Sequence, residues 1–324
     1  MKMFVRIYKL EHFRIHFKRN LLTRNRNNNN IERMKTIKEK LNLVIVVIMV
    51  LPFLIACNNN SDSLDEPITG DYFPSNLNNL WNYSIENVST TNPNLNSEFQ
   101  DAIKVSNVDV NSFTLEVNNG GIAYGPVSTI LASGDLTKFD SSLEYNGNLS
   151  LPILSEFVST ANSQIALADF VIYDLEADVD SELASLSNSI TENIDFDGNA
   201  VATTISYTVS NTRKSNLNSL VVEDEVFNDV ISTEIVIDLS VYLSFGVLVD
   251  QPLLEPQNVI TITNYYAKDV GLIKSEANLS YSLNEGLINL LRLAGVTIDF
   301  ETNGAINTTQ QITSYSIDTN WLHN

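Results

Sequence analysis

The sequence is poor in the residues that build disulfides, zinc sites and nucleophilic catalysts. It contains one cysteine, Cys57, and three histidines, with His12 and His16 near its start and His323 near its end. A disulfide framework needs paired cysteines, so that class of protein is excluded. The sequence also has too few histidines outside its ends for a multi-histidine zinc site or for a Ser/His or Cys/His catalytic pair. We therefore expect no catalytic residue, no metal site and no cofactor.

Basic residues are scarce after position 56. Residues 1–56 hold 12 of the 19 Lys and Arg and 3 of the 39 Asp and Glu, which leaves 7 basic against 36 acidic residues in the remainder. A protein that follows a phosphate backbone needs a basic stripe on its surface. The sequence therefore excludes nucleic acid as a partner.

Residues 34–56 have the pattern of a bacterial secretion signal. Three lysines precede an apolar run over 41–56, which is 16 residues long. A membrane-spanning helix needs roughly 20 residues, so this run has the length of a signal sequence. It ends in Leu54-Ile55-Ala56-Cys57, which resembles the lipobox of bacterial lipoproteins. The alternative is an uncleaved signal anchor in which the cysteine is incidental.

The lipobox resemblance implies a lipid anchor at Cys57. In that family the thiol takes a diacylglyceryl group, the leader is cleaved, and the new amine receives a further acyl chain such as palmitate. Each buried CH₂ contributes about 0.8 kcal/mol, so several chains anchor a protein stably. Asn58 replaces the aspartate that retains some lipoproteins in the inner membrane. We expect outer-membrane anchoring, with the periplasmic and the cell-surface face both open.

The organisation along the chain follows from these segments. We expect residues 1–33 to be untranslated, with translation starting at Met34, or disordered; a long basic region ahead of the signal is the alternative. Residues 57–69 are polar and acidic, which is typical of a flexible tether. Residues 70–324 are interpreted as a single β-rich domain. Two smaller β domains that meet near 176–200 are the alternative.

The apolar residues of the body recur with a period of two, which predicts strands. Strands are expected around residues 105–110, 113–117, 205–209, 235–243, 259–266, 279–283, 296–300 and 312–317. Turn chemistry separates many of them, at Asn118 to Gly121, Asn146 to Asn148, Asp197 to Asn199, and Asn303-Gly304. Helical spacing is confined to residues 181–191 and 285–294. The sequence therefore predicts a mainly β fold, a large curved antiparallel sheet or half-open barrel with one or two covering helices.

Two short motifs resemble those of a broad group of uncharacterised bacterial lipoproteins. The first is Tyr72-Phe73-Pro74 followed by Asn79, Trp81 and Tyr83, and the second is Tyr266-Ala267-Lys268-Asp269-Val270-Gly271-Leu272-Ile273-Lys274. Ser75, Asn78 and Asp269 depart from the pattern of the group. Asn and Asp tolerate left-handed backbone, so turns at these positions can form. The resemblance implies a half-open barrel similar to lipoprotein carriers of the LolA and LolB type, whose concave face shelters apolar ligands.

The residues of both motifs also suit structural roles. Trp81 and Tyr83 share one face of a strand, which favours core or cross-strand packing over a ligand platform. Lys268 and Lys274 are two of few basic residues in an acidic body. We expect them to be solvated or to pair with acidic side chains.

Three acidic clusters are candidates for chemistry. Glu176, Asp178, Asp180 and Glu182 could supply oxygen ligands to calcium, although a helix start explains them better. The segment 193–198 begins like a calcium loop, but Thr204 stands where the bidentate Glu belongs, so an Asp-Gly hairpin is favoured. Glu223 and Glu225 could form a glycosidase pair, yet a solvated acidic surface is the better interpretation.

These observations predict a lipid-anchored protein of the cell envelope. We expect a non-enzymatic binding module for an apolar molecule, a glycan or a partner protein. One alternative is a structural or adhesive surface component, favoured by the Asn, Thr and Ser content of the strands. The other is a carboxylate-based polysaccharide hydrolase.

Overall fold

The computed structural model describes residues 68–150, 164–196, 199–293, 295 and 301–318. These residues form a 12-stranded antiparallel sheet in the order β6-β5-β4-β3-β2-β1-β12-β11-β10-β9-β8-β7. Its strands are β1 (Leu80–Ser89), β2 (Ser97–Val108), β3 (Ser112–Val117), β4 (Gly134–Lys138), β5 (Ser142–Ser150), β6 (Gln164–Asp174), β7 (Glu182–Phe196), β8 (Asn199–Val222), β9 (Glu225–Phe245), β10 (Leu248–Ala267), β11 (Gly271–Ser282) and β12 (Asn303–Ser316). The predicted mainly β fold with a large curved sheet is confirmed.

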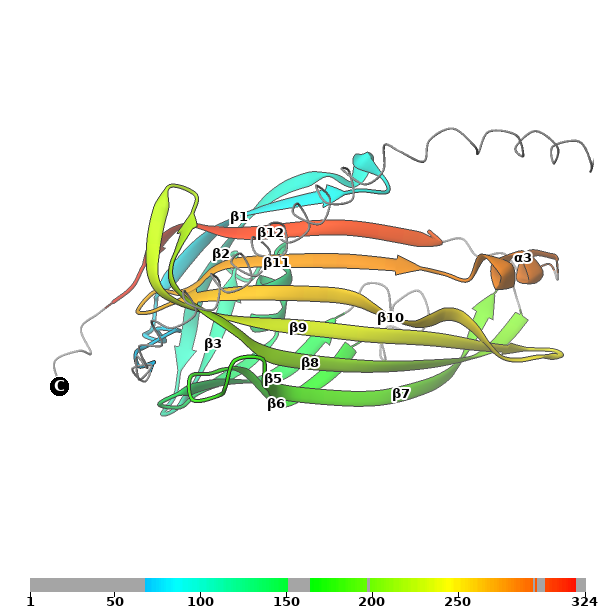
Figure 1. Cartoon of the computed structure of the whole chain (residues 1–324), viewed down its shortest axis with the longest axis horizontal. Helices are drawn as coiled ribbons and strands as arrows, with labels where there is room; N and C mark the ends of the chain where they lie inside the picture. Colours follow the sequence, from blue (N-terminus) through cyan, green and yellow to red (C-terminus); the bar gives the residue numbers. More distant parts are fainter. Residues whose placement is uncertain (1–67, 151–163, 197–198, 294, 296–300, 319–324) are drawn as a thin grey trace, which may run out of the picture. The chain divides into compact units, whose positions relative to one another are not determined.

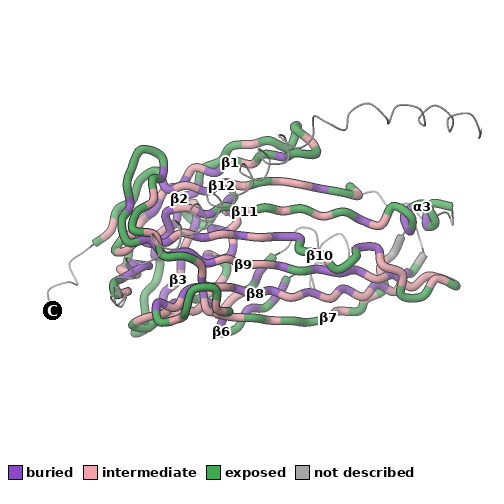
Figure 2. The backbone as a smooth tube through the Cα atoms, viewed as in Figure 1, coloured by how far each residue is buried: buried purple, intermediate pink, exposed green. Residues whose placement is uncertain are grey.

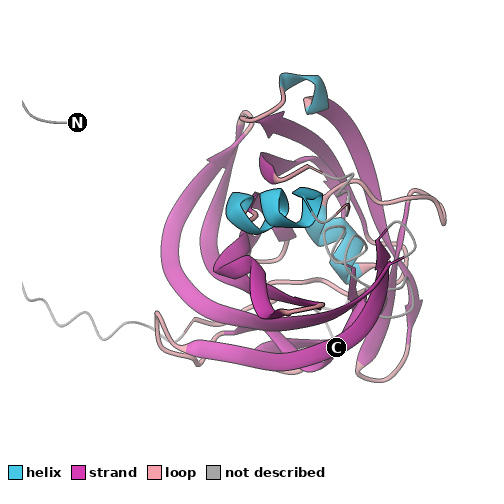
Figure 3. Cartoon of the chain, turned by 90° about the vertical axis from the view of Figure 1, so that its right-hand side faces the viewer, coloured by secondary structure: helices cyan, strands magenta, loops and turns pink. Residues whose placement is uncertain are grey.

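The sheet curls until its two edge strands approach each other, which makes a nearly closed barrel (Figures 1 and 3). The edge strands are β6 and β7, and no backbone ladder joins them. Asn211 of β8 spans this seam, because its side-chain amide donates to the carbonyls of Val171 (2.7 Å) and Ile172 (2.9 Å) in β6. On the other side of β6, the ladder between β5 and β6 has a β-bulge here, because Leu143 pairs with Tyr173 and Glu144 pairs with Val171. Ile172 therefore has no register partner in β5. A side chain therefore closes the barrel where backbone pairing stops.

Burial alternates along the strands, as Figure 2 shows. In β9 the residues Ile235, Ile237, Leu239 and Val241 are all buried, whereas Asp238 between them is exposed. Period-two burial is the mark of a sheet with one face in the core. The inner faces of the strands share one hydrophobic cluster, so the core lies inside the barrel.

Two α-helices accompany the sheet, together with the 3₁₀ turn η1 (Pro93–Leu95). Helix α2 (Pro126–Leu131) was not predicted, because its six residues are too few to show helical periodicity. Its apolar residues Val127, Ile130 and Leu131 are buried within the core cluster. Helix α3 (Glu285–Leu293) confirms the helix predicted over 285–294, and its residues Leu287, Ile288 and Leu291 are buried. No helix among the described residues has both the length and the apolar content needed to span a membrane.

The helix predicted over 181–191 is wrong, since Glu182–Phe196 is strand β7. Leu186 and Ile190 lie four residues apart, a spacing that fits one helical turn and also two repeats of a strand. The neighbouring β8 decides between them, because it pairs Leu186 with Val209 and Ile190 with Ile205. Long-range pairing here overrides local periodicity.

The turn predictions have mixed outcomes. The turn at Asn118 to Gly121 is confirmed, with positive φ at Asn118, Asn119 and Gly120. The turn at Asn146 to Asn148 is wrong, because these residues belong to β5, where a Cβ on Gly147 would lie 2.7 Å from Gly134 Cα. Asn303-Gly304 begins β12 instead of forming a turn. Residues 197–198 and the strand predicted over 296–300 lie outside the described residues.

Candidate functional site

The two sequence motifs meet at one end of the barrel. Trp81 Nε1 donates to the Val270 carbonyl at 2.6 Å, and the Tyr83 hydroxyl donates to the Leu272 carbonyl at 2.8 Å. Gly271 lies between these acceptors with φ +105°, and a Cβ there would lie 3.3 Å from Trp81 Nε1. Trp81 and Tyr83 are buried, which confirms their predicted packing role. The motifs therefore form a structural joint between β1 and β11.

The segment that precedes β1, which includes Asp71 and Phe73, contacts the same end of the barrel. The Asp269 amide donates to the Asp71 carbonyl at 2.6 Å, and Asp71 Oδ2 forms an ion pair with Lys138 Nζ at 2.6 Å. Phe73 packs against Trp81 with 5.3 Å between ring centroids. Lys274 pairs with Glu276 at 2.8 Å, as expected of a lysine on an acidic surface.

Buried tyrosines surround this segment. Tyr173 packs against Tyr72 and against Tyr266, with centroid separations of 6.4 Å and 5.5 Å. Burial, reinforced by the charge of Asp229, raises the pKa of Tyr72 to about 12. Burial also raises the pKa of Tyr173 and of Tyr266 well above the usual value. Phenols with raised pKa stay protonated near neutral pH, so this cluster offers hydrogen bonds and no general base.

The acidic residues 176–182 do not begin a helix, so that prediction is wrong. Glu176, Asp178 and Asp180 lie in the loop before β7, and Glu182 begins the strand. Asp180 has φ +64° and lies 3.8 Å from Lys214 Nζ. Within the described part of the chain, no group of three or more His, Cys, Asp or Glu is placed to hold a metal ion.

The other two acidic candidates lie at hairpins. β7 and β8 pair as far as Phe196 and Asn199, as a hairpin at that point requires. Thr204, the twelfth position of the calcium-like segment, bonds through its hydroxyl to Thr191 of β7 at 3.1 Å. Glu223 lies in the turn between β8 and β9, Glu225 begins β9, and both are exposed. Glu225 accepts a hydrogen bond from the Tyr315 hydroxyl at 3.1 Å.

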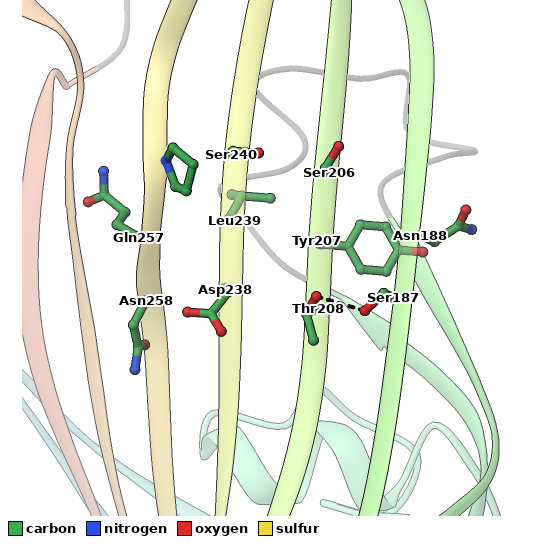
Figure 4. A pocket seen from close by; sticks show the side chains of 11 residues that line it. Ser187, Asn188, Ser206, Tyr207, Thr208, Asp238, Leu239, Ser240, Gln257 and Asn258 are labelled. Carbon is green, nitrogen blue, oxygen red and sulfur yellow. Dashed lines mark hydrogen bonds between the residues drawn. The ribbon is translucent and has the colours of Figure 1, made fainter.

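An open hollow crosses four neighbouring strands, β7 to β10 (Figure 4). Its volume is about 600 Å³ and it is open to solvent. Its lining comprises Ser187, Asn188, Ser206, Tyr207, Thr208, Asp238, Leu239, Ser240, Pro256, Gln257 and Asn258. The hollow therefore gathers residues from four strands that follow one another along the chain.

The bulged course of β10 shapes this hollow. Leu254 pairs with Val241 and Gln257 pairs with Leu239, so β10 carries an extra residue at this point. Pro256 lies inside the bulge, as expected because proline has no N–H to donate to a ladder. The bulge brings Gln257 and Asn258 into the lining of the hollow, beside β9.

One row of polar side chains runs across the hollow. Ser187, Thr208, Asp238 and Asn258 are consecutive partners in the registers of β7 to β10, and Figure 4 shows them side by side. The hydroxyls of Ser187 and Thr208 are 2.8 Å apart. The row combines hydroxyl, carboxylate and amide groups, so it can both donate and accept hydrogen bonds.

A second open hollow of about 570 Å³ lies beside α2. It is lined by Ser106, Leu115, Glu116, Val117, Gly120, Gly121, Ile122, Ala123, Thr129, Ala132 and Ser133. Asp101 fixes the neighbouring loop, because its carboxylate accepts from the amides of Tyr124 and Gly125. Ile122 is exposed in this loop.

Where the carrier resemblance implies an apolar concave face, the described inward side chains form the buried core cluster. Inward side chains such as Ile205, Ile237 and Ile262 are buried in the core cluster, as is Leu131 of α2. Both hollows are open and mix polar with apolar lining residues, and neither was predicted from the sequence. In the sequence, the lining residues form only a pattern of alternate polar residues in several strands, and this pattern does not reveal which strands are neighbours.

Cys57 lies outside the described residues. The chain matches no family model, no curated protein and no solved structure.

Proposed function

We propose that this chain is a lipid-anchored protein of the outer membrane and acts as a non-enzymatic binding module. The sequence Leu54 to Cys57 supports the anchor, because it joins an aliphatic residue, a small residue and the single cysteine at the end of an apolar run. Acyl chains on Cys57 hold the protein at the membrane surface. The barrel that follows supplies the binding surface.

Among the ligand classes that the sequence left open, the row of polar side chains across the open hollow favours a glycan. Drug-sized apolar ligands occupy enclosed pockets with apolar linings. The hollow across β7 to β10 is instead open, and the row Ser187, Thr208, Asp238 and Asn258 runs through it. Sugar hydroxyls both donate and accept hydrogen bonds, so they match such a row. This hollow is the observation that carries the proposed function.

The charge of the body selects among glycans. Seven basic residues against 36 acidic ones remain after position 56, and Asp238 adds a carboxylate to the hollow itself. An acidic polysaccharide would be repelled by this surface. The proposed ligand is therefore a neutral glycan.

A glycan array with the full chain in detergent tests the proposal. The matched variants are Asp238→Ala and Glu255→Ala, because each removes one exposed carboxylate and only Asp238 lines the hollow. Loss of a hydrogen bond to a charged group weakens binding by about tenfold or more. We expect that loss for Asp238→Ala and unchanged binding for Glu255→Ala. Binding of no neutral glycan by the wild type, or equal losses in both variants, would contradict the proposal.

A further inference from the structure

A row of buried polar residues crosses the inner face of the barrel, where apolar residues would be expected. Consecutive register partners place one such residue on each of five neighbouring strands, in the order Arg213, Thr233, Asn264, Ser275 and Gln310. Each of the five is at most 1% exposed. We call these five residues the polar row. Their shared register puts them at one level of the barrel, in β8, β9, β10, β11 and β12.

Most hydrogen-bonding groups of the polar row have no partner among the residues that the structure describes. The unpartnered atoms are Arg213 Nε and Nη1, Thr233 Oγ1, both amide atoms of Asn264, Ser275 Oγ and Gln310 Oε1. The Tyr266 hydroxyl and Asn211 Oδ1, on the same strands, are unpartnered as well. Gln310 Nε2 donates to Ser128 Oγ of α2 at 2.9 Å, and Arg213 Nη2 donates to Asn216.

Such a concentration of unpartnered groups points to a ligand. More than nine in ten buried polar groups in native proteins are hydrogen-bonded, and each buried group left unpaired is destabilising. The described part of the chain has nearly all of its unpartnered buried side-chain atoms here; the remaining one, Asp71 Oδ2, lies in its ion pair with Lys138. The polar row is therefore built for a polar molecule that brings its own donors and acceptors.

The positive charge of Arg213 indicates how the ligand is oriented along the polar row. Arg213 belongs to none of the ion pairs formed among the described residues. Burial lowers the pKa of its guanidinium, and the nearby Tyr72 and Asp174 oppose that effect. A buried cation is stable only when a negative group compensates it. Asp174 favours the charge of Arg213 but forms no ion pair with it among the described residues, so the guanidinium is the place for the anionic end of the ligand.

We propose that the polar row binds a small organic carboxylate that carries hydroxyl groups, with its carboxylate at Arg213. A guanidinium binds carboxylates through charge-assisted hydrogen bonds. Hydroxyls can donate to Asn264 Oδ1 and accept from Asn264 Nδ2. Neighbouring strands are about 4.8 Å apart, so the backbone positions from Arg213 to Asn264 span about 10 Å, and a small ligand between their long side chains can contact both.

The position of Arg213 offers a route into the barrel. Its backbone pairs with Asp180 and Ser181, in the loop that joins the two edge strands. The sheet has no continuous ladder at this seam, so opening it breaks fewer hydrogen bonds than opening the barrel elsewhere. This site lies inside the barrel and does not depend on the outer glycan hollow.

The proposal is tested by calorimetric titration of the full chain in detergent. The ligand is D-glucuronate, and D-glucose is the control sugar without a carboxylate. The wild type is expected to bind glucuronate at least tenfold more tightly than glucose. Arg213→Met should weaken glucuronate binding by about tenfold to a hundredfold. Lys214→Met is the control, because the adjacent Lys214 pairs at the surface with Glu234, and it should leave binding unchanged.

A milder variant keeps the test valid if Arg213→Met fails to fold. Thr233→Val removes one hydroxyl at nearly constant volume and should weaken glucuronate binding about threefold to tenfold. Equal binding of the two sugars by the wild type would overturn the proposal. Equal effects of Arg213→Met and Lys214→Met, or full affinity in Thr233→Val, would also overturn it. Loss of glycan binding in Asp238→Ala with retained glucuronate binding would separate the two sites.

Discussion

Asn211 is the side chain that joins the two edges of the sheet, and its removal gives the sharpest prediction about stability. Its amide donates to the carbonyls of Val171 and Ile172, and the side chain is fully buried. Asn211→Ala removes both donors. Each lost hydrogen bond costs about 1 kcal/mol, and a carbonyl left buried without a donor adds about 1–3 kcal/mol. We expect the free energy of unfolding to fall by about 3–5 kcal/mol.

Urea unfolding of the wild type and of two variants measures this effect. The control is Asn278→Ala, because the Asn278 amide bonds to Asn307 Oδ1 at 2.7 Å on the exposed face of the sheet. Surface substitutions of this kind change stability by about 0.5 kcal/mol or less. Hydrogen exchange in β6 should accelerate only in Asn211→Ala, since its seam contact is lost. Equal stabilities of the two variants would refute the role assigned to Asn211.

Three further predictions concern the motif joint and the buried tyrosines. Gly271→Ala should lower stability by about 1–3 kcal/mol in thermal unfolding, because φ is +105° and the Cβ would crowd Trp81; an unchanged midpoint would contradict this. Lys138→Met should lower the free energy of unfolding by about 1–3 kcal/mol, because it removes the ion-pair partner of buried Asp71. Lys104→Met removes one partner of a surface pair at 3.9 Å and should lower it by less than about 1 kcal/mol. Equal losses of stability in urea unfolding would count against this prediction. Since burial raises the pKa of Tyr72 from 10.0 to about 12, the unfolded chain loses this proton first, so stability should fall as pH rises from 10 to 12; a spectrophotometric titration with all tyrosines ionising together near 10 would rule this out.

The sequence is sufficient to predict the β architecture, because inward and outward residues alternate in nearly every strand. It is insufficient where one spacing fits two structures, as with Leu186 and Ile190 in β7. The glycines were also ambiguous as turn signals. Gly147 and Gly304 lie within strands, at positions where a neighbouring residue packs too closely for a side chain, although turns were predicted there. Turn chemistry and tight packing both select glycine, and only the register distinguishes them.

The candidate sites depend even more on register. Within β8, Asn211 and Arg213 interrupt the inward apolar residues that include Ile205 and Val209, and this break was readable from the sequence. Its partners Thr233, Asn264, Ser275 and Gln310 are scattered over a long stretch of chain, and pairing alone aligns them. The outer hollow likewise requires the bulge of β10. Both sites were therefore beyond prediction from residue patterns in one chain.

We propose that lipid on Cys57 holds the protein at the membrane, and the intact mass of the protein in the membrane fraction is the direct test. Wild type and Cys57→Ala are compared. We expect a wild-type chain that begins at residue 57 and carries the added mass of a diacylglyceryl group and an acyl chain, and a Cys57→Ala chain without them. A wild-type chain that retains its leader, or that begins at residue 57 without acyl mass, would show that Cys57 is not a lipid anchor.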